Sequence, residues 1–300
     1  MMPGGAGKDG TDVRTACTVR LPDGRDLGYA DWGDPGGTPV LHLHGTPGSR
    51  LTYDYADGPA RALGVRVIAP DRPGIGLSSA KPGYSLDDIA ADMAELADAL
   101  GLDRFAMLAW SGGGPYGLAT AAALGDRVSA LAMVAPAGLL DTRASRKGMS
   151  GLDRAGWMLS MFTPRLGAPM LGAAMRWSLR HPVNATKSFA SKLPRIEMEL
   201  LAALPPAVEG PIIGSAEAGR QGGRGIVDDY RAISRPWTFR PEDVQVRTQF
   251  WHGDQDKYVP LRVSEELAER VPNAELRLRP GSGHLIALSH YEEILTDLLN

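Results

Sequence analysis

The stretch that decides the fold is Leu108-Ala109-Trp110-Ser111-Gly112-Gly113-Gly114-Pro115. The apolar run 105–110 is typical of a buried strand, and 115–124 is typical of a helix. A serine on a tight turn between a strand and a helix is the pattern of a nucleophile elbow. Such a turn needs small residues two positions before and after the serine, where this chain has Ala109 and Gly113. The stretch therefore predicts that Ser111 is a catalytic nucleophile.

The same turn has a second interpretation. Gly112, Gly114 and Gly117 have the G-x-G-x-x-G spacing of a dinucleotide-binding turn. That site needs an acidic residue at the tip of the following strand to hold a ribose. The following strand, 130–135, instead ends in Pro136-Ala137-Gly138. The missing acid favours the elbow, with a plain serine–glycine loop as the remaining alternative.

Outward from this stretch, predicted strands and helices alternate. We expect a hairpin from 18–21 and 26–32, strands at 40–43, 65–69 and 130–135, and helices at 51–63 and 85–100. After 236, the pattern predicts strands at 248–251 and 274–278 and helices at 263–270 and 291–299. Such alternation is typical of an α/β fold with a mostly parallel central sheet and flanking helices.

The segment 138–235 interrupts this alternation. Its patterns predict helices at 151–162, 168–180, 184–203 and 213–232, and no convincing strand. It holds 14 Lys and Arg against 8 Asp and Glu, so it is basic, whereas the rest of the chain is acidic. This excess favours a solvated face, or alternatively attraction of an anionic substrate. We expect a flexible terminus at 1–15, a core of 16–137 and 236–300, and a helical insertion at 138–235.

A serine nucleophile needs a base, and the base needs an orienting acid. His284 follows the predicted strand 274–278, so it can reach the edge of the sheet where Ser111 is expected. Asp254 and Asp256 both follow the predicted strand 248–251. Aspartate is also a common turn residue, so these patterns alone leave the choice between the two open.

Five motifs in order resemble those of α/β-hydrolase fold enzymes. They are His44-Gly45-Thr46-Pro47-Gly48, Asp71-Arg72-Pro73-Gly74-Ile75-Gly76-Leu77-Ser78, the Ser111 elbow, the Gly253…Asp256…Pro260 loop and Gly283-His284. The resemblance covers nearly all of 18–137 and 236–300, and the order Ser, Asp, His is that of the family.

The resemblance also implies roles for single residues. It implies a triad of Ser111, Asp256 and His284, with Asp254 left as a turn residue. The backbone N–H groups of Thr46 and Gly112 would form the oxyanion hole. The insertion 138–235 would be a cap over the site. Candidates for the substrate pocket are Trp110, Trp157, Met158, Met161, Phe162, Met175, Trp177 and Phe189. For any single one of those in the cap, packing in the cap's own core is the favoured interpretation.

In function, the resemblance implies a serine hydrolase that forms an acyl-enzyme on Ser111 and needs no cofactor. We expect a carboxylic ester or lactone of small to medium size with an apolar portion. Serine at position 111 argues against dehalogenases and epoxide hydrolases of this fold, which use aspartate there. A carbon–carbon bond hydrolase, an aminopeptidase, a perhydrolase, an acyltransferase and a non-catalytic small-molecule receptor remain open.

Composition excludes several other classes. The 300 residues carry a formal net charge of −3, so the chain lacks the excess of positive charge that is typical of a nucleic-acid binder. Cys17 is the single cysteine, so an internal disulfide or a cysteine-based zinc site is excluded. His42 and His44 have no further ligands nearby, and we expect no metal. No signal peptide or membrane span is recognisable, so we expect a cytoplasmic protein, and a homodimer remains open. Arginine outnumbers lysine 26 to 6, which is typical of a GC-rich bacterial genome.

Overall fold

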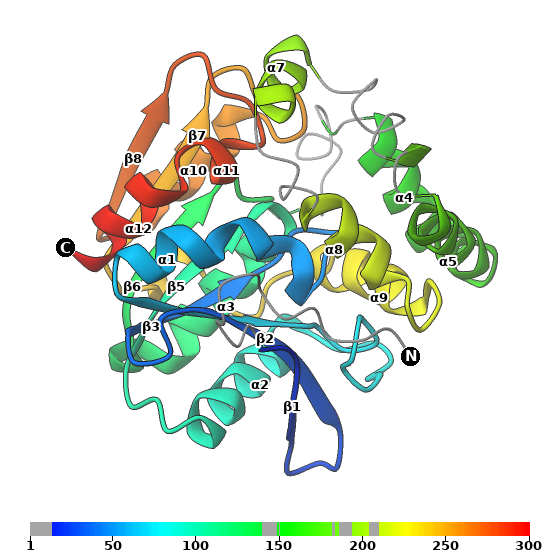
Figure 1. Ribbon diagram of the computed structural model, residues 1–300, viewed down its shortest axis with the longest axis horizontal. Coiled ribbons are helices and arrows are strands. Elements are labelled where there is room, and N and C mark those ends of the chain that lie inside the picture. Colours follow the sequence, from blue (N-terminus) through cyan, green and yellow to red (C-terminus); the bar gives the residue numbers. More distant parts are fainter. Residues whose placement is uncertain (1–13, 140–148, 150, 182–183, 186–193, 204–209) are drawn as a thin grey trace.

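A central eight-stranded sheet organises the molecule (Figure 1). The computed structural model describes residues 14–139, 149, 151–181, 184–185, 194–203 and 210–300. The strands are β1 (Arg14–Arg20), β2 (Asp26–Gly33), β3 (Thr38–Leu43), β4 (Val65–Pro70), β5 (Phe105–Trp110), β6 (Val128–Val134), β7 (Thr248–Gly253) and β8 (Ala274–Arg279). Their order across the sheet is β1-β2-β4-β3-β5-β6-β7-β8.

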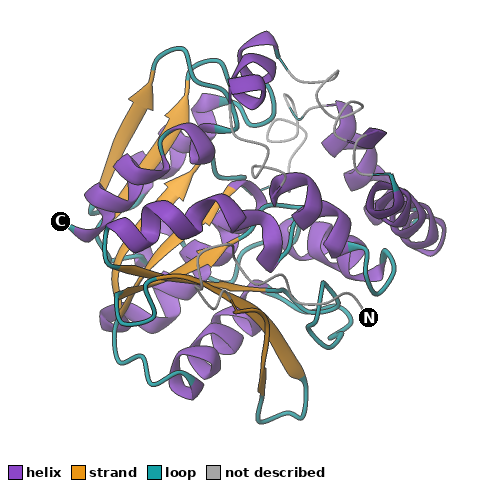
Figure 2. Cartoon of the chain, in the orientation of Figure 1, coloured by secondary structure: helices purple, strands orange, loops and turns teal. Residues whose placement is uncertain are grey.

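Strand direction confirms the predicted α/β class. β2 pairs antiparallel with both β1 and β4, whereas all pairs from β4 to β8 are parallel. Helices cover both faces of the sheet (Figure 2). One core cluster contains side chains of α2 (Leu86–Ala99), α3 (Gly114–Leu124) and α10 (Leu261–Arg270). The other contains side chains of α1 (Asp57–Ala62), α11 (Ile286–Ser289) and α12 (Tyr291–Leu299).

Local sequence explains the elements that carry the site. Every residue of β5 is buried, as its unbroken apolar run predicts for a central strand. α2 begins after Ser85, whose Oγ accepts the Asp88 N–H at 3.2 Å while the Asp88 carboxylate accepts the Ser85 N–H at 2.8 Å. The expected helix 51–63 differs: a 3₁₀ segment, Arg50–Ala56, precedes α1. Tyr53 interrupts this segment with a non-helical φ of −114° and ψ of 31°, and its buried ring stacks on His42.

The described residues between β6 and β7 form helices and no strand. They are α4 (Gly151–Phe162), α5 (Pro164–Arg180), α7 (Arg195–Ala203), α8 (Gly210–Ala218) and α9 (Arg224–Ile233). The single helix expected at 213–232 is two helices, α8 and α9, because Gly222 has a φ of 99° that ends regular helix. The helix expected at 184–203 falls partly outside the described residues. No helix in the described ranges is long and apolar enough to cross a membrane.

Candidate active site

Ser111 lies on a strained turn between β5 and α3. Its φ is 53°, in a region that non-glycine residues rarely adopt, at a cost of about 1–3 kcal/mol. The turn also brings backbone segments close together: a Cβ on Gly113 would collide with the backbone of Leu43. The small residue that the sequence predicts at position 113 is therefore a steric requirement. The turn presents the Ser111 hydroxyl at the carboxyl edge of the sheet.

His284 and Asp256 meet Ser111 at that edge. The Ser111 hydroxyl lies 3.0 Å from Nε2 of His284, and Nδ1 of His284 lies 2.8 Å from Oδ2 of Asp256. The other carboxylate oxygen of Asp256 accepts the backbone N–H groups of Tyr258 at 2.7 Å and Val259 at 2.9 Å. These bonds fix the carboxylate, which in turn selects the tautomer with the proton on Nδ1 and leaves Nε2 as an acceptor.

Asp254, the competing acid, has a different environment. Its Oδ1 accepts the N–H of Gly281 at 2.7 Å, so it joins the loop after β7 to the loop after β8. Asp256, by contrast, is hydrogen-bonded directly to His284. The carboxylate against His284 is therefore that of Asp256, and Asp254 bridges the two loops.

Charge around His284 favours its protonated form. Burial opposes a charge on the imidazole, but Asp256 together with other nearby carboxylates raises the pKa of His284 above its ordinary value. Glu197 and Asp153, both from the helical insertion, act in the same direction. Burial also opposes ionisation of Asp256, but His284 and His252 hold the pKa of that carboxyl well below its usual range. The surrounding charges therefore favour an ion pair between the His284 imidazolium and the Asp256 carboxylate.

Thr46 and Gly112 lie beside one another next to Ser111. A Cβ on Gly112 would lie only 2.9 Å from the backbone nitrogen of Thr46, so these two main-chain segments are in close contact. Both residues also line a cavity together with Ser111. The two residues whose amides the resemblance implies for an oxyanion hole are thus neighbours at the cavity that Ser111 lines.

Two cavities meet at Ser111, with volumes of about 420 and 500 Å³. Thr46, Ser111, Asp153 and Tyr258 line both. The first cavity continues toward α10 and is also lined by Gly112, Met149, Tyr230, Ile233, Trp237 and Val263. The second continues toward α5 and α8 and is also lined by Trp110, Met175, Trp177, Ile212, Ala216 and His284.

Of the pocket candidates from sequence, Trp110, Met175 and Trp177 therefore lie at a cavity beside Ser111. The lining of neither cavity includes Trp157, Met158, Met161 or Phe162. Trp157 is buried and its Nε1 donates to Ser234 at 2.8 Å, while Met161 packs against a core cluster. Met158 and Phe162 are instead 50% and 71% exposed. Phe189 is outside the described residues.

Most of the chain matches one known protein family. The family model described as "alpha/beta hydrolase fold" matches residues 38–291. The chain belongs to the α/β-hydrolase fold family. This finding confirms the resemblance drawn from the five motifs and the fold that it implied.

Relatives of this hydrolase carry several names. A non-heme haloperoxidase of Rhodococcus erythropolis is 28% identical, over 94% of this chain and 97% of its own. A bifunctional esterase/perhydrolase of Acinetobacter calcoaceticus is 26% identical, over 94% and 97%. Among solved structures, a bromoperoxidase from Bacillus anthracis matches with a TM-score of 0.70 and 21% identity, over 95% and 99% of the two chains. At that identity the structural match shows the shared fold.

A buried network that sequence reasoning missed supports the Thr46 segment of the hydrolase. Arg72 donates to the carbonyl oxygens of His44 at 2.6 Å and Gly45 at 2.9 Å, and to both oxygens of Asp229 at 2.8 Å. Asp229, on α9, also accepts the Thr46 hydroxyl at 2.7 Å. In the sequence, Arg72 is marked only by its place in the motif that begins at Asp71. Asp229 belongs to no motif, so the sequence gives no sign of its role.

Glu197 is a second residue that the sequence did not reveal. It lies on α7, is only 1% exposed, and accepts the backbone N–H of Leu285 at 2.8 Å. Its carboxylate also packs against Gly283, where a Cβ would lie 2.5 Å from Oε1. Glu197 thus contacts the residues on both sides of His284, and burial raises the pKa of its own carboxyl.

Among the described residues, no group of three or more His, Cys, Asp or Glu side chains is arranged to hold a metal ion. Cys17 is half-buried on β1, where it lies opposite Tyr29 of β2. The chemistry that this arrangement supports is nucleophilic attack by a serine hydroxyl.

Proposed function

We propose that this hydrolase cleaves a carboxylic ester or lactone of small to medium size, with an apolar portion, through an acyl-enzyme on Ser111. The observation that carries the proposal is the hydrogen-bonded series from Ser111 through His284 to Asp256, at 3.0 and 2.8 Å. A base within hydrogen-bonding distance of a hydroxyl, itself oriented by a carboxylate, is what serine nucleophiles require.

In the proposed reaction, His284 takes the Ser111 proton as Oγ attacks the carbonyl carbon. The backbone N–H groups of Thr46 and Gly112 stabilise the oxyanion, at about 3 kcal/mol for each donor. The His284 imidazolium then protonates the leaving oxygen as its bond to the acyl carbon breaks. Water, deprotonated by His284, attacks the acyl-enzyme and releases the acid and free Ser111.

The two cavities suggest where each half of the substrate lies. His284 must reach the leaving oxygen to protonate it, and His284 lines the second cavity. We therefore place the alcohol portion in that cavity, beside Trp110 and Ile212. The acyl portion then lies in the first cavity, beside Gly112 and Tyr230. The insertion 138–235 serves as the cap in this proposal, because α4, α5, α8 and α9 all contribute lining residues.

A fluorophosphonate probe tests the nucleophile. It should label the native protein, and labelling should be lost in Ser111→Ala but retained in a Ser160→Ala control, in which a buried serine outside both cavities is changed. Labelling that persists in Ser111→Ala would contradict the assignment. A series of nitrophenyl esters of increasing acyl length then measures acyl preference, and a preference for long chains would contradict the expected substrate size.

Perhydrolysis is the second candidate, favoured by the haloperoxidase and esterase/perhydrolase relatives, each matched over 94% of this chain. Hydrogen peroxide would replace water in the second step, so that attack on the acyl-enzyme releases a peracid and free Ser111. Peracid formed from acetate and hydrogen peroxide is measured by bromide oxidation. Peracid formation that is absent in the native protein, while esters are still cleaved, would rule this reaction out.

A further inference from the structure

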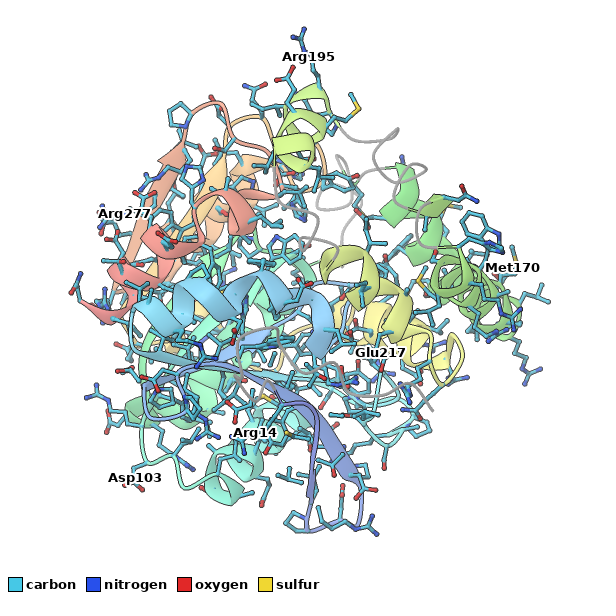
Figure 3. The ribbon with its side chains drawn as sticks, in the orientation of Figure 1. Arg14, Asp103, Met170, Arg195, Glu217 and Arg277 are labelled. Carbon is cyan, nitrogen blue, oxygen red and sulfur yellow. The ribbon has the colours of Figure 1, made fainter. Side chains whose placement is uncertain are left out.

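Exposed apolar side chains gather on two neighbouring helices of the insertion. Nine large hydrophobic side chains are exposed in the described residues, and six of them lie on α4 and α5. These six are Met158, Phe162, Leu166, Met170, Trp177 and Leu179. Leu166 and Met170 are 64% and 57% exposed, and Figure 3 shows Met170 at the outer edge of the molecule. Such clustering on one part of a surface is typical of an interaction site.

Leu166, Met170 and Trp177 form an apolar stripe along α5. Their spacings of four and seven residues place them on one side of a helix. Few residues attach this helix to the rest of the protein: within α5, only Gly167 and Gly172 are fully buried. Gly172 packs so closely on the backbone of Gly223 that a Cβ there would lie 2.6 Å from its nitrogen. Most of the surface of α5 therefore faces outward, as Figure 1 shows.

The charges on α5 are all positive. Arg165, Arg176 and Arg180 are exposed, and the helix contains no Asp or Glu. A helix with an apolar stripe that includes tryptophan, bordered by arginines, is suited to the boundary between lipid headgroups and acyl chains. A symmetric contact between two copies would instead bring the same arginines together, which disfavours a second copy as the occupant of this face.

The stripe also leads toward the nucleophile. Trp177 belongs to the stripe and lines the second cavity, together with Ala174, Met175 and Ser178 from the adjacent side of α5. Ser111 lines the same cavity. An apolar molecule beside the stripe would therefore be next to an opening that continues to Ser111.

We propose that α5 is the helix by which this protein binds an anionic phospholipid surface. Leu166 and Met170 insert at the headgroup boundary, and Arg165, Arg176 and Arg180 contact the phosphates. The basic excess of the insertion acts through these arginines. Binding itself does not depend on the proposed esterase activity, so the two proposals can fail separately.

Vesicle sedimentation tests the proposal with two lipid compositions, phosphatidylcholine alone and a mixture of about three parts phosphatidylcholine to one part phosphatidylglycerol. The native protein should bind the anionic vesicles, and binding should weaken as salt is raised. Each arginine changed to glutamine should weaken binding by up to about fivefold. The triple variant R165Q/R176Q/R180Q is matched by R20Q/R104Q/R240Q, which removes the same charge from exposed sites elsewhere.

The apolar part of the surface is tested by Leu166→Ser with Met170→Ser. This variant should lose binding, whereas the control Leu63→Ser, at a position 38% exposed on another face, should keep it. Thermal unfolding shows whether each variant is folded. Equal binding of neutral vesicles, or equal loss in both arginine triples, would overturn the proposal. So would a native dimer that L166S/M170S converts to a monomer without any binding of the native protein to vesicles.

Discussion

At the scale of single residues, the position of each carboxylate around His284 determines its role. Asp256 contacts the imidazole directly, Asp254 joins two loops, and Glu197 contacts the residues on either side of His284. All three are acidic residues near one histidine, but only one of them can select its tautomer. Substitutions of these three carboxylates should therefore change different kinetic properties, and by different amounts.

We expect Asp256→Asn to lower kcat by about 10⁴-fold, because an amide permits the wrong imidazole tautomer. Asp254→Asn should have a much smaller effect, since an amide oxygen can still accept the Gly281 N–H. Steady-state kinetics on a nitrophenyl ester measures both. Similar, small losses for the two variants would show that neither aspartate orients His284.

The pH profile tests the electrostatic part of the site. His284 must be neutral to act as a base, and its raised pKa places the acidic limb of kcat/KM at a higher pH than for an ordinary histidine. Glu197→Gln removes one of the negative charges that raise this pKa, besides those of Asp256 and Asp153. The acidic limb should then move to lower pH. An unmoved limb would show that Glu197 does not act on His284 through its charge.

A second variant of Glu197 separates the effect of its charge from the effect of its hydrogen bond. Glu197→Ala also removes the acceptor for the Leu285 N–H, so kcat should fall further than in Glu197→Gln. Equal kcat values in the two variants would mean that the hydrogen bond does not position the His284 loop. A glutamine oxygen keeps that bond, and this makes it the matched control for charge.

At the scale of elements, the first and last parts of the insertion differ in their attachment to the core. Arg50 pairs with Asp71 at 2.9 Å and with Glu217 of α8 at 2.8 Å, and Figure 3 marks Glu217 on that helix. Asp229 of α9 pairs with Arg72 at 2.8 Å. All of these side chains are buried. Two ion pairs thus hold α8 and α9 to the core, whereas α5 is largely exposed.

Breaking the second ion pair should destabilise the hydrolase. Asp229→Ala leaves Arg72 buried without its carboxylate, and such losses cost about 3–5 kcal/mol. Activity should fall as well, because the Thr46 hydroxyl loses its acceptor. Asp228→Ala is the matched control, because its partner Arg224 is exposed and the expected cost is about 1 kcal/mol or less. Urea unfolding measures both, and equal costs would contradict the importance assigned to Asp229.

How far the sequence predicts these elements depends on the range of the interactions. The tight turn at Ser111, β5 and α2 follow from residues close together in the chain, and so do the strands and helices expected after 236, which the structure also contains. The break between α8 and α9 was missed although Gly222 and Gly223 mark it, because the apolar spacing continues across them. Asp229 and Glu197 were missed because their partners, Thr46 and Leu285, are distant in sequence and no local pattern joins them.

At the scale of the whole molecule, the two cavities predict separate control of the two halves of the substrate. Ile212→Phe would narrow the second cavity and should lower kcat/KM for esters with bulky alcohols. Val263→Phe would narrow the first cavity and should do so for bulky acyl groups. Measuring kcat/KM of both variants on both ester series provides an internal control. If each variant discriminates against both series equally, the assignment of acyl and alcohol portions is wrong.

The two buried ion pairs of α8 and α9 determine how the insertion 138–235 can be exchanged between enzymes. A chimera that takes the whole of 138–235 from a donor enzyme would discard Glu217 and Asp229, and would leave Arg72 without its carboxylate and Arg50 with Asp71 as its remaining partner. A crossover placed before Gly210 would graft only the outer helices and retain both pairs. The crossover point that preserves both ion pairs therefore lies inside the insertion, not at its ends.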